Sequence, residues 1–477
     1  MCMHDMKNNP EVTKMRILCG TVVVAAMSAC QAFAAHVAVD FDTAIGQVKP
    51  VNGVGQPPMV GKCGDYPMMH YLREAGIPYS RLHDVGGWLG GGLFVDIPNL
   101  FPDFDADEND PKNYRFAYTD SLMKALDASG VEPFFRLGVT IENFVERGFP
   151  PVNILPPKDY AKWGRICEHV IRHYTEGWAD GFKMKISHWE IWNEPDNNPD
   201  DDINPMFRGP FSEYMRLYGT VAPYLKAKFP HLKIGGYGSC GFYAAVGSGR
   251  VAAANSSPRL VHFVDCFTNF LSHAKAENWP LDFFSFHSYS LPDDARLQIA
   301  YARRTLDEFG FGNTAMSFNE WLPYPALESL GTARQAALIA AELIDLQNGP
   351  CDTAMIYDAR CGVGNYSPLF NPLTQKPHRA YYAFMAFNEL RKAGTAVKAT
   401  SDDCKVRAAG AKGTSGRTVM VVNCSKEPKP IALSLGKGET PQLTCRITDG
   451  MRTWEETPLP ASLPAWSFAV VAIPDRP

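Results

Sequence analysis

Hydrophobic residues recur at two different spacings along the chain between about residue 45 and residue 392. Short apolar runs, each the length of one buried strand, are followed by stretches in which apolar residues recur at helical spacing. The clearest helical stripe contains Trp163, Ile166, Val170 and Tyr174, and it leads into the apolar run 186–192. The other runs that predict strands are 48–51, 77–83, 131–137, 232–234, 281–286, 315–318 and 353–357.

This alternation of strands and helices predicts an α/β fold. Because parallel strands need a long crossover connection, usually a helix, the helices between the apolar runs imply parallel pairing. The number of strand–helix units comes close to the eight that close into a (β/α)8 TIM barrel. Gly76 and Gly130 follow two of the helical stripes, a position at which glycine commonly ends a helix.

After about residue 393 the pattern changes. Short β-rich runs separated by Gly, Pro, Lys and Ser continue to the end of the sequence, and no helical stripe occurs among them. This texture predicts a small C-terminal antiparallel β-sandwich. The expected organisation is therefore a signal segment at 1–34, a barrel at 35–392 and an accessory sandwich at 393–477.

The first 34 residues have the features of a secretory signal peptide. Lys14 and Arg16 precede an apolar run over 17–29, and the segment 32–34 offers the small residues that cleavage requires. We therefore expect a secreted or periplasmic protein, with Met15 as an alternative start. A lipoprotein with a lipid anchor on Cys30 is the alternative to ordinary cleavage. No other run reaches the roughly 18 unbroken apolar residues of a membrane-spanning helix.

Composition and charge narrow the possible partners. Hydrophobic residues make up 45% of the chain and charged residues 20%, so a large core can be buried. A net charge of −5 without a basic cluster argues against nucleic acid or an anionic membrane as the main partner. Spacings such as Cys240 and Cys266, or Cys351 and Cys361, permit disulfides without establishing them. The absence of a CxxC pair or a His/Cys cluster argues against structural zinc.

The strongest chemical signal lies where two predicted strands end. Asn193, Glu194 and Pro195 follow the apolar run 186–192, and Glu320 ends a later strand. TIM-barrel active sites are built at these carboxyl ends of the strands. Cleavage of a glycosidic bond requires two carboxyls, one protonated to assist the leaving oxygen and one ionised to attack the anomeric carbon. The pair Glu194 and Glu320 therefore indicates a glycoside hydrolase.

The segment from Trp189 to Pro195 resembles the Trp-Glu-x-Trp-Asn-Glu-Pro signature of glycoside hydrolase family 39, the β-xylosidase and α-L-iduronidase family of clan A. The similarity covers most of the barrel, from 51–53 through 81–83 and 282–289 to the helix near residue 377. It implies a retaining hydrolase of terminal β-linked sugars, with β-xylosides as the expected substrates and Glu194 as acid/base. Glu320 would be the nucleophile, the partner would be an oligosaccharide or glycoside, and no metal or organic cofactor is expected.

The same resemblance implies which residues bind the sugar. Asn193 would donate a hydrogen bond to the sugar 2-hydroxyl, and Arg81 would keep Glu320 ionised because a nearby cation lowers a carboxyl pKa. A complementary expectation is a raised pKa for Glu194. The resemblance also implies His83, His287 and Tyr289 as residues that line the sugar subsite. Trp321, next to Glu320, and Asp358, in the segment that ends the eighth strand, are further predicted substrate-binding residues.

Two segments depart from the family pattern. Glu320 follows Asn319, where family members often have Thr, and the eighth strand ends in Tyr357-Asp358-Ala359-Arg360, where a Trp often forms the floor of the sugar site. These differences affect which sugar is recognised more than which reaction is catalysed. An iduronide, arabinoside or galactoside is therefore the alternative to a β-xyloside as substrate. A non-catalytic carbohydrate-binding barrel is the alternative from another class, and the presence of both carboxylates argues against it.

Other polar and glycine-rich segments have simpler interpretations. Glu190 alternates with the strand pleat and is expected to be structural, buried or paired. Asp196 and the acidic run 200–202 lack EF-hand spacing, which favours a solvated loop over a calcium site. The glycine-rich segment 86–92 lacks the Gly-Lys-Ser/Thr end of a phosphate loop, so it predicts a loop over the site, with Trp88 as a candidate sugar-stacking residue. For His83 and His287, a place in the core is the alternative to a site role.

Overall fold

The computed structural model describes residues 34–61, 64–85, 95–246, 257–414, 416–436 and 443–473. The predicted signal segment, apart from residue 34, and the glycine-rich segment 86–92 lie outside these residues. Across the described ranges, no helix combines the length and the apolar character needed to cross a membrane. The eight cysteines in the described ranges are all free, so the bridges that the spacings permit are not formed.

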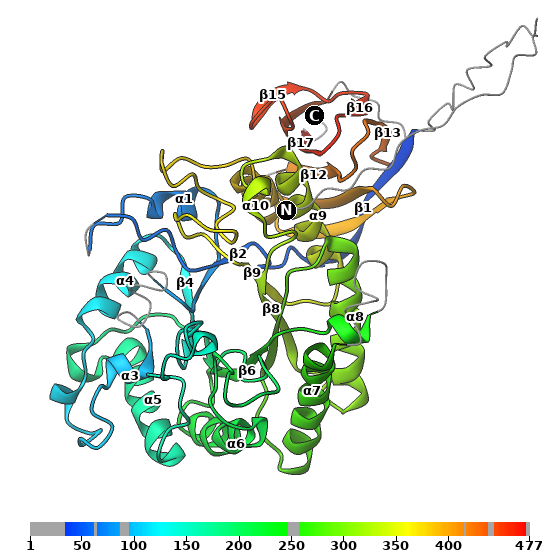
Figure 1. Ribbon diagram of the computed structural model, residues 1–477. Coiled ribbons are helices and arrows are strands. Elements are labelled where there is room, and N and C mark those ends of the chain that lie inside the picture. Colours follow the sequence, from blue (N-terminus) through cyan, green and yellow to red (C-terminus); the bar gives the residue numbers. More distant parts are fainter. Residues whose placement is uncertain are drawn as a thin grey trace, which may run out of the picture. The chain divides into compact units, whose positions relative to one another are not determined.

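Eight strands close into a parallel barrel, which confirms the predicted fold class (Figure 1). Each strand pairs in parallel with the next along the chain, and the last strand closes the barrel by pairing with the first. The strands are β2 (Gly53–Gly55), β3 (Tyr79–Leu82), β4 (Glu132–Leu137), β5 (His188–Ile191), β6 (Lys233–Ser239), β7 (Phe283–Ser288), β8 (Ala315–Trp321) and β9 (Thr353–Ile356).

Helices alternate with the barrel strands, as the helical stripes predict. In α5 the side chain of Asp159 caps the first turn by accepting a hydrogen bond from the Lys162 amide at 2.9 Å, and the predicted stripe is buried. Gly76 and Gly130 have φ of +58° and +71° just after α1 and α4, which confirms both predicted helix ends. The helices are α1 (Met69–Glu74), α3 (Ile97–Leu100), α4 (Ala117–Ala128), α5 (Tyr160–Thr175), α6 (Phe211–Lys228), α7 (Pro258–Ala276), α8 (Pro292–Glu308), α9 (Ala333–Asn348) and α10 (Tyr381–Ala393).

A second sheet contains the C-terminal strands, as predicted, but it also takes in the first strand of the chain. Its nine strands form one hydrogen-bonded order, β15-β14-β17-β12-β11-β10-β1-β13-β16, in which β1 and β13 are parallel and the other neighbours are antiparallel. The strands are β1 (Ala35–Gln47), β10 (Thr395–Ser401), β11 (Val406–Gly413), β12 (Gly416–Asn423), β13 (Lys429–Ser434), β14 (Thr444–Thr448), β15 (Glu455–Pro458), β16 (Ser462–Leu463) and β17 (Ser467–Ile473).

Strand β1 changes the expected start of the barrel. The sequence assigns residues 35–47 to the barrel and expects its first strand at 48–51, whereas β1 pairs with β10 and the first barrel strand is β2. Val37 and Val39 are buried, and Asp40 is exposed. This alternation is typical of an antiparallel strand with one solvated face, whereas the barrel strands are buried along most of their length.

The nine-stranded sheet buries apolar residues on both faces. One face forms a core within the sheet, with Val37, Val419 and Val471 among its buried members. Met420 and Val422 on the other face belong to the same apolar core as the barrel, where β11 and β12 contact α9 and α10. Figure 1 shows these two helices lying beside the sheet.

Candidate active site

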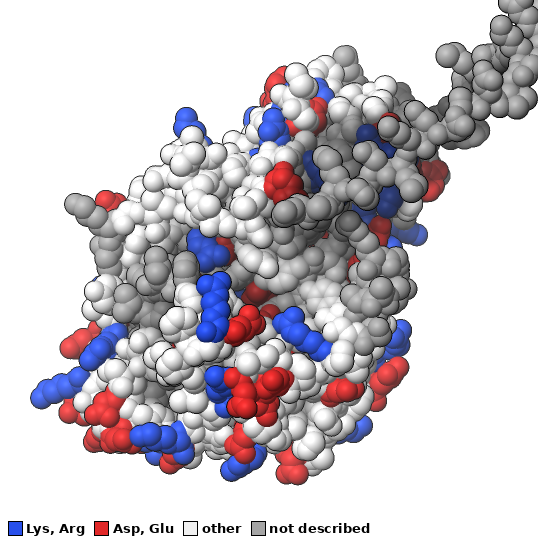
Figure 2. Space-filling view, in the orientation of Figure 1, with Lys and Arg blue, Asp and Glu red and all other residues white. Residues whose placement is uncertain are grey.

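A cavity of about 780 Å³ opens at the carboxyl ends of the barrel strands. Glu194, in the loop that follows β5, and Glu320, near the end of β8, both line this cavity. Figure 2 shows that this face of the molecule is hollowed. The structure therefore brings together the two carboxyls that the sequence singles out, from strands far apart along the chain.

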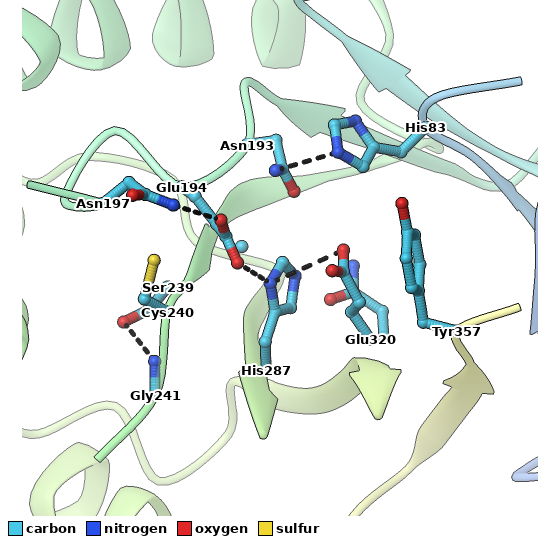
Figure 3. Close-up of polar contacts among 12 residues, drawn as sticks. His83, Asn193, Glu194, Asn197, Ser239, Cys240, Gly241, His287, Glu320 and Tyr357 are labelled. Atoms are coloured by element: carbon cyan, nitrogen blue, oxygen red, sulfur yellow. Dashed lines mark hydrogen bonds and ion pairs between the residues drawn. The ribbon is translucent and has the colours of Figure 1, made fainter. Parts of the chain in front are cut away.

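The two carboxylates meet around His287 of β7 (Figure 3). One oxygen of each glutamate and one ring nitrogen of His287 all lie within 4.8 Å of one another. His287 Nδ1 is 2.7 Å from Glu194 Oε1 and 3.6 Å from Glu320 Oε2. A spacing of about 5 Å between two carboxyls lets one attack the anomeric carbon directly, whereas a wider gap admits water. The arrangement can therefore support double displacement.

The backbone at Glu194 adopts a sparsely populated conformation. Trp192 has φ of +71° and Glu194 has φ of +43°, both in the left-handed region that non-glycine residues rarely enter. The Glu194 amide donates to the carbonyl of Gly238 at 3.0 Å, which ties the loop to the end of β6. Backbone of this kind persists only where the surroundings hold it, and it is common at active sites.

Glu194 is held by one neighbour on its own loop and by two neighbours from other strands' ends. Asn197 Nδ2 donates to Glu194 Oε2 at 2.8 Å, His287 lies against the other oxygen, and the Cys240 thiol also hydrogen-bonds to the carboxylate. The residue is only 9% exposed, so these contacts replace most of the hydration of its carboxylate. The orientation of the carboxyl is therefore set before a ligand binds.

Glu320 is held in a different environment. Arg81 Nη1 donates to Glu320 Oε2 at 3.0 Å, and the Tyr289 hydroxyl donates to Glu320 Oε1. Both donors stabilise the ionised form of the carboxyl, which is the form that a nucleophile needs. The predicted contact between Arg81 and Glu320 is present.

Arg81 is the centre of a buried polar network beneath the cavity. It donates to Glu190 Oε2 at 2.8 Å and to the amide oxygen of Asn193. Glu190 in turn accepts from Ser285 at 2.6 Å and from Asn319 at 2.7 Å, and it is fully buried. Glu190 is thus buried and paired, as the strand pleat predicts.

The pKa values of the two carboxyls shift in the opposite directions to those expected, which were a raised pKa for Glu194 and a lowered one for Glu320. Burial acts to raise the pKa of Glu194, but hydrogen bonds from His287 and Asn197 outweigh it and hold this pKa below its usual value. Burial raises the pKa of Glu320, and the charge of Glu194 adds to this rise against the charges of His287 and Arg81. The reason lies in the position of His287, whose raised pKa favours an imidazolium and whose Nδ1 is closer to Glu194 than to Glu320.

Two further predicted residues line the cavity, and Asn193 contacts one of them. His83 and Tyr289 line the cavity, and Asn193 Nδ2 donates to His83 Nε2 at 3.1 Å just below it. Because the Asn193 oxygen accepts from Arg81, the orientation of the amide is fixed. His83 is neutral, since burial lowers its pKa well below the usual value.

Five predicted substrate-binding residues do not line the cavity. Arg81, Asn193 and His287 are buried in the polar network around the two carboxyls, whereas Trp321 and Asp358 occupy other places. Trp321 is only 1% exposed, its ring stacks on Phe318 in the apolar core, and it does not line the cavity. Asp358 is fully buried and pairs with Arg360 at 3.0 Å, so Arg360 lines the cavity instead. Residues alternate between the two sides of a strand, so a neighbour of a site residue in sequence points away from the site.

Asp196 does not lie in a solvated loop. It is fully buried, accepts a hydrogen bond from Ser239 at 2.8 Å, and is approached by the Cys240 amide at 3.3 Å. Burial raises the pKa of Asp196 to about 7, with a contribution from the nearby charge of Glu194. The acidic run at 200–202 predicts a solvent-exposed loop. Asp196, the first carboxyl of this loop after Glu194, is instead buried against the end of β6.

Several residues in and around the cavity are not among the predicted site residues. Tyr357 donates to Asp84 at 2.8 Å and accepts from Gln56 at 3.0 Å, which builds a polar wall between β9 and β3. These residues lie at or just after strand ends, and position relative to the strand end is the signal that could have identified them. Other cavity residues outside the predicted site include Asn197, Cys240, Tyr243, Arg259, Phe263 and Tyr366.

Glu194, His287 and Glu320 also have the donor types and the spacing of a metal site. Arg81 lies 3.0 Å from the Glu320 oxygen, however, and its fixed positive charge would repel a divalent cation at the same oxygen. The donor set is therefore better suited to proton transfer and nucleophilic attack than to metal binding.

Two carboxyls lie at the mouth of a closed (β/α)8 barrel, one beside an asparagine and one held by an arginine and a tyrosine. This combination is typical of the clan A glycosidases. A sequence model of the family described as "Glycosyl hydrolases family 39" matches residues 70–307. The chain belongs to this family, a family of glycosidases.

Curated relatives support the assignment over part of their length. A β-xylosidase of Geobacillus stearothermophilus is 29% identical over 207 residues, which cover 42% of this chain and 36% of the relative. A β-xylosidase of Caldicellulosiruptor saccharolyticus is 29% identical over 171 residues, which cover 34% of this chain and 31% of the relative. The matches thus span about a third of each relative.

Solved structures share the fold over nearly the whole chain. A glucosidase from Croceicoccus marinus has a TM-score of 0.70 at 20% identity, covering 92% of this chain and 98% of the glucosidase. A family 39 β-xylosidase from Caulobacter crescentus has a TM-score of 0.63 at 17% identity, covering 91% of this chain and 99% of the xylosidase. At these identities the likeness concerns the fold alone.

Proposed function

We propose that the protein is a retaining glycoside hydrolase that releases terminal β-linked sugars, with β-xylosides as its substrates. The observation that carries this proposal is the meeting of Glu194 and Glu320 around the buried His287. The three groups lie within 4.8 Å of one another, and both carboxyls line one cavity. The two curated β-xylosidase relatives support the choice of sugar.

In the first step, Glu320 attacks the anomeric carbon while a proton reaches the leaving oxygen through Glu194. His287, 2.7 Å from Glu194 Oε1 and with a raised pKa, holds this proton beforehand and passes it to Glu194. The glycosidic C–O bond breaks, and an ester bond between Glu320 and the sugar forms. Arg81 and the Tyr289 hydroxyl keep the attacking carboxylate ionised and oriented until the bond forms. Asn193, whose amide orientation is fixed by Arg81, is placed to donate to the sugar 2-hydroxyl.

In the second step, water attacks the same carbon while Glu194 accepts a proton from it. The ester bond breaks, and Glu320 leaves as a carboxylate, which restores the enzyme. Ester formation removes the negative charge of Glu320, and this loss lowers the pKa of Glu194. The carboxyl that acts as an acid in the first step is thereby suited to act as a base in the second.

We also propose that the protein works outside the cytoplasm, as a secreted or periplasmic enzyme. The basic and apolar pattern of residues 14–34 supports this proposal. N-terminal sequencing of the protein recovered from the medium or periplasm would reveal cleavage near residue 34. A cytoplasmic protein with its N-terminus intact would contradict it.

The enzymatic proposal is tested with a panel of aryl glycosides that includes β-xylosides, arabinosides, galactosides and iduronides. We expect turnover of β-xylosides by the wild type and a loss of at least about 10³-fold in Glu320→Ala. Added azide should restore turnover and give the glycosyl azide of inverted configuration, which identifies the nucleophile. Glu308→Ala, at an exposed position on α8, is a matched control.

The stereochemical course is read from the first anomer released in an NMR time course. Release of the anomer with the configuration of the substrate supports two displacements, whereas the opposite anomer contradicts them. Sugar binding without turnover on any glycoside, by wild type and Glu320→Ala alike, would instead favour a carbohydrate-binding protein.

A further inference from the structure

We propose that Asn197 and Arg259 form a clamp that positions the acid/base Glu194 for proton transfer to the leaving group. This inference rests on the proposed function and adds two positioning residues to it. Neither residue belongs to the set that the sequence singles out, and both line the cavity beside Glu194.

Asn197 is attached to Glu194 through both its backbone and its side chain. Its amide N–H donates to the Glu194 carbonyl at 3.0 Å, and its Nδ2 donates to Glu194 Oε2 at 2.8 Å. Asn197 is only 7% exposed, so this pair of bonds is shielded from water. Figure 3 shows the Asn197 side chain pointing at one carboxylate oxygen while His287 lies against the other.

Arg259, in the first turn of α7, determines which way the Asn197 amide faces. Its Nη2 donates to Asn197 Oδ1 at 2.9 Å, and its Nε donates to the Asn197 carbonyl at 2.6 Å. A guanidinium can only donate, so it selects the amide oxygen and leaves Nδ2 directed at Glu194. The Arg259 guanidinium also lies 5.2 Å from the centre of the Phe263 ring, one helical turn further on, which restrains it further.

Asn197 and His287 hold different oxygens of Glu194. Asn197 donates to Oε2, whereas His287 lies 2.7 Å from Oε1 and 3.6 Å from Glu320 Oε2. The clamp therefore holds the oxygen of Glu194 that does not contact the histidine shared with Glu320. Charged or titratable groups from several elements surround Glu194. They are Asp196 on its own loop, Arg81 of β3, Cys240 just after β6, His287 of β7, Tyr289 just after β7, and Glu320 of β8, with Tyr243 and Tyr366 further out.

Leaving-group dependence separates a positioning role from a merely structural one. The dinitrophenolate leaving group departs from its glycoside without protonation. The phenolate leaving group of an unsubstituted phenyl glycoside needs a proton from the general acid. For Asn197→Leu and Arg259→Gln we expect kcat/KM on the phenyl glycoside to fall by about tenfold or more, and kcat/KM on the dinitrophenyl glycoside to change by less than about threefold. Arg216→Gln, in an exposed ion pair on α6, is the matched control and should leave both values unchanged. Equal losses on both substrates, or no loss on either, would overturn the proposal.

Asn197→Asp provides a second variant that keeps the acceptor for Arg259 while replacing the donor to Glu194 by a negative charge. The alkaline limb of kcat/KM on the phenyl glycoside should move up by about one pH unit, because the added charge makes Glu194 harder to ionise. A ¹³C NMR titration of the Glu194 carboxyl should show the same upward shift without any turnover, and an unchanged titration would refute the clamp. Failure of the proposed function would appear differently, as a wild type that hydrolyses no glycoside.

Discussion

At the scale of single residues, the environment of Glu320 suits the role of nucleophile that we propose for it. Burial raises its pKa, whereas Arg81 at 3.0 Å and the Tyr289 hydroxyl both act to lower it. The Tyr289 hydroxyl stays protonated, because burial and the neighbouring charge of Glu320 raise its pKa well above the usual value. Its proton therefore stays available to the nucleophile across the working pH range.

Tyr289→Phe tests this contribution. Loss of the donor should raise the pKa of Glu320, so the acidic limb of kcat/KM moves to higher pH by about one unit. At the pH optimum kcat/KM should fall about tenfold or more, because a hydrogen bond to a charged group is lost. Tyr382→Phe, on α10 and remote from the cavity, is the control. An acidic limb that stays in place would show that Tyr289 does not tune Glu320.

At the scale of elements, strand β6 shows how closely the barrel packs beneath the site. Its sequence contains three glycines, and a side chain at Gly235 would meet the Phe283 carbonyl of β7 at 2.1 Å. Gly238 has φ of +64°, and a Cβ there would lie 2.9 Å from Asn193 Oδ1 and 3.2 Å from His287 Nε2. Gly238 is therefore required both by its backbone conformation and by the side chains that surround the sugar site.

Gly238→Ala and Gly130→Ala form a matched pair. Both glycines are left-handed, but a Cβ at Gly130 meets open space. Each substitution should lower the free energy of unfolding by about 1–2 kcal/mol through backbone strain. Only Gly238→Ala should also reduce kcat by about tenfold or more, since it displaces Asn193. Urea unfolding and steady-state kinetics measure the two effects, and equal activity in both variants would contradict the explanation.

At the scale of the whole molecule, the barrel and the nine-stranded sheet share a charged interface as well as an apolar core. Arg407 of β11 pairs with Asp345 of α9 at 2.9 Å and with Asp293 of α8. Glu342, one turn before Asp345, is buried, and neither of its carboxylate oxygens has a hydrogen-bond partner among the described residues. Burial therefore raises the pKa of Glu342 well above its usual value, and the charge of Asp345 adds to the rise.

Glu342 should make the stability of the protein fall as pH rises. The folded state keeps the Glu342 proton above the unfolded pKa of about 4.3, so the free energy of unfolding decreases from that pH up through the raised folded pKa. For Glu342→Gln, the free energy of unfolding relative to wild type should increase between pH 5 and pH 8. Glu308→Gln, whose carboxylate stays in water, should show no such trend in the same urea series. A constant difference for Glu342→Gln would contradict this prediction.

Much of the fold and the centre of the site could be predicted because their signals are local. The stripe through Trp163 and Tyr174, the glycine stops at Gly76 and Gly130, and the apolar run before Glu194 each reflect contacts with near neighbours along the chain. Position at the end of a strand then directs Glu194 and Glu320 to one face of the barrel. Strand β1 was missed because its partner β10 lies hundreds of residues away and leaves no trace in local spacing.

The sequence by itself determined the repeating strand–helix order, the antiparallel module that follows it, and the identity of the two facing carboxyls, because period and strand ends are properties of short segments. Only the tertiary structure decided that Asp196 turns inward, that Trp321 belongs to the core, and that Arg259 reaches Asn197 beside the acid/base. Those outcomes depend on which side chains meet across the barrel mouth. The directions of the two carboxyl pKa shifts likewise depend on neighbours from other parts of the barrel, His287 among them.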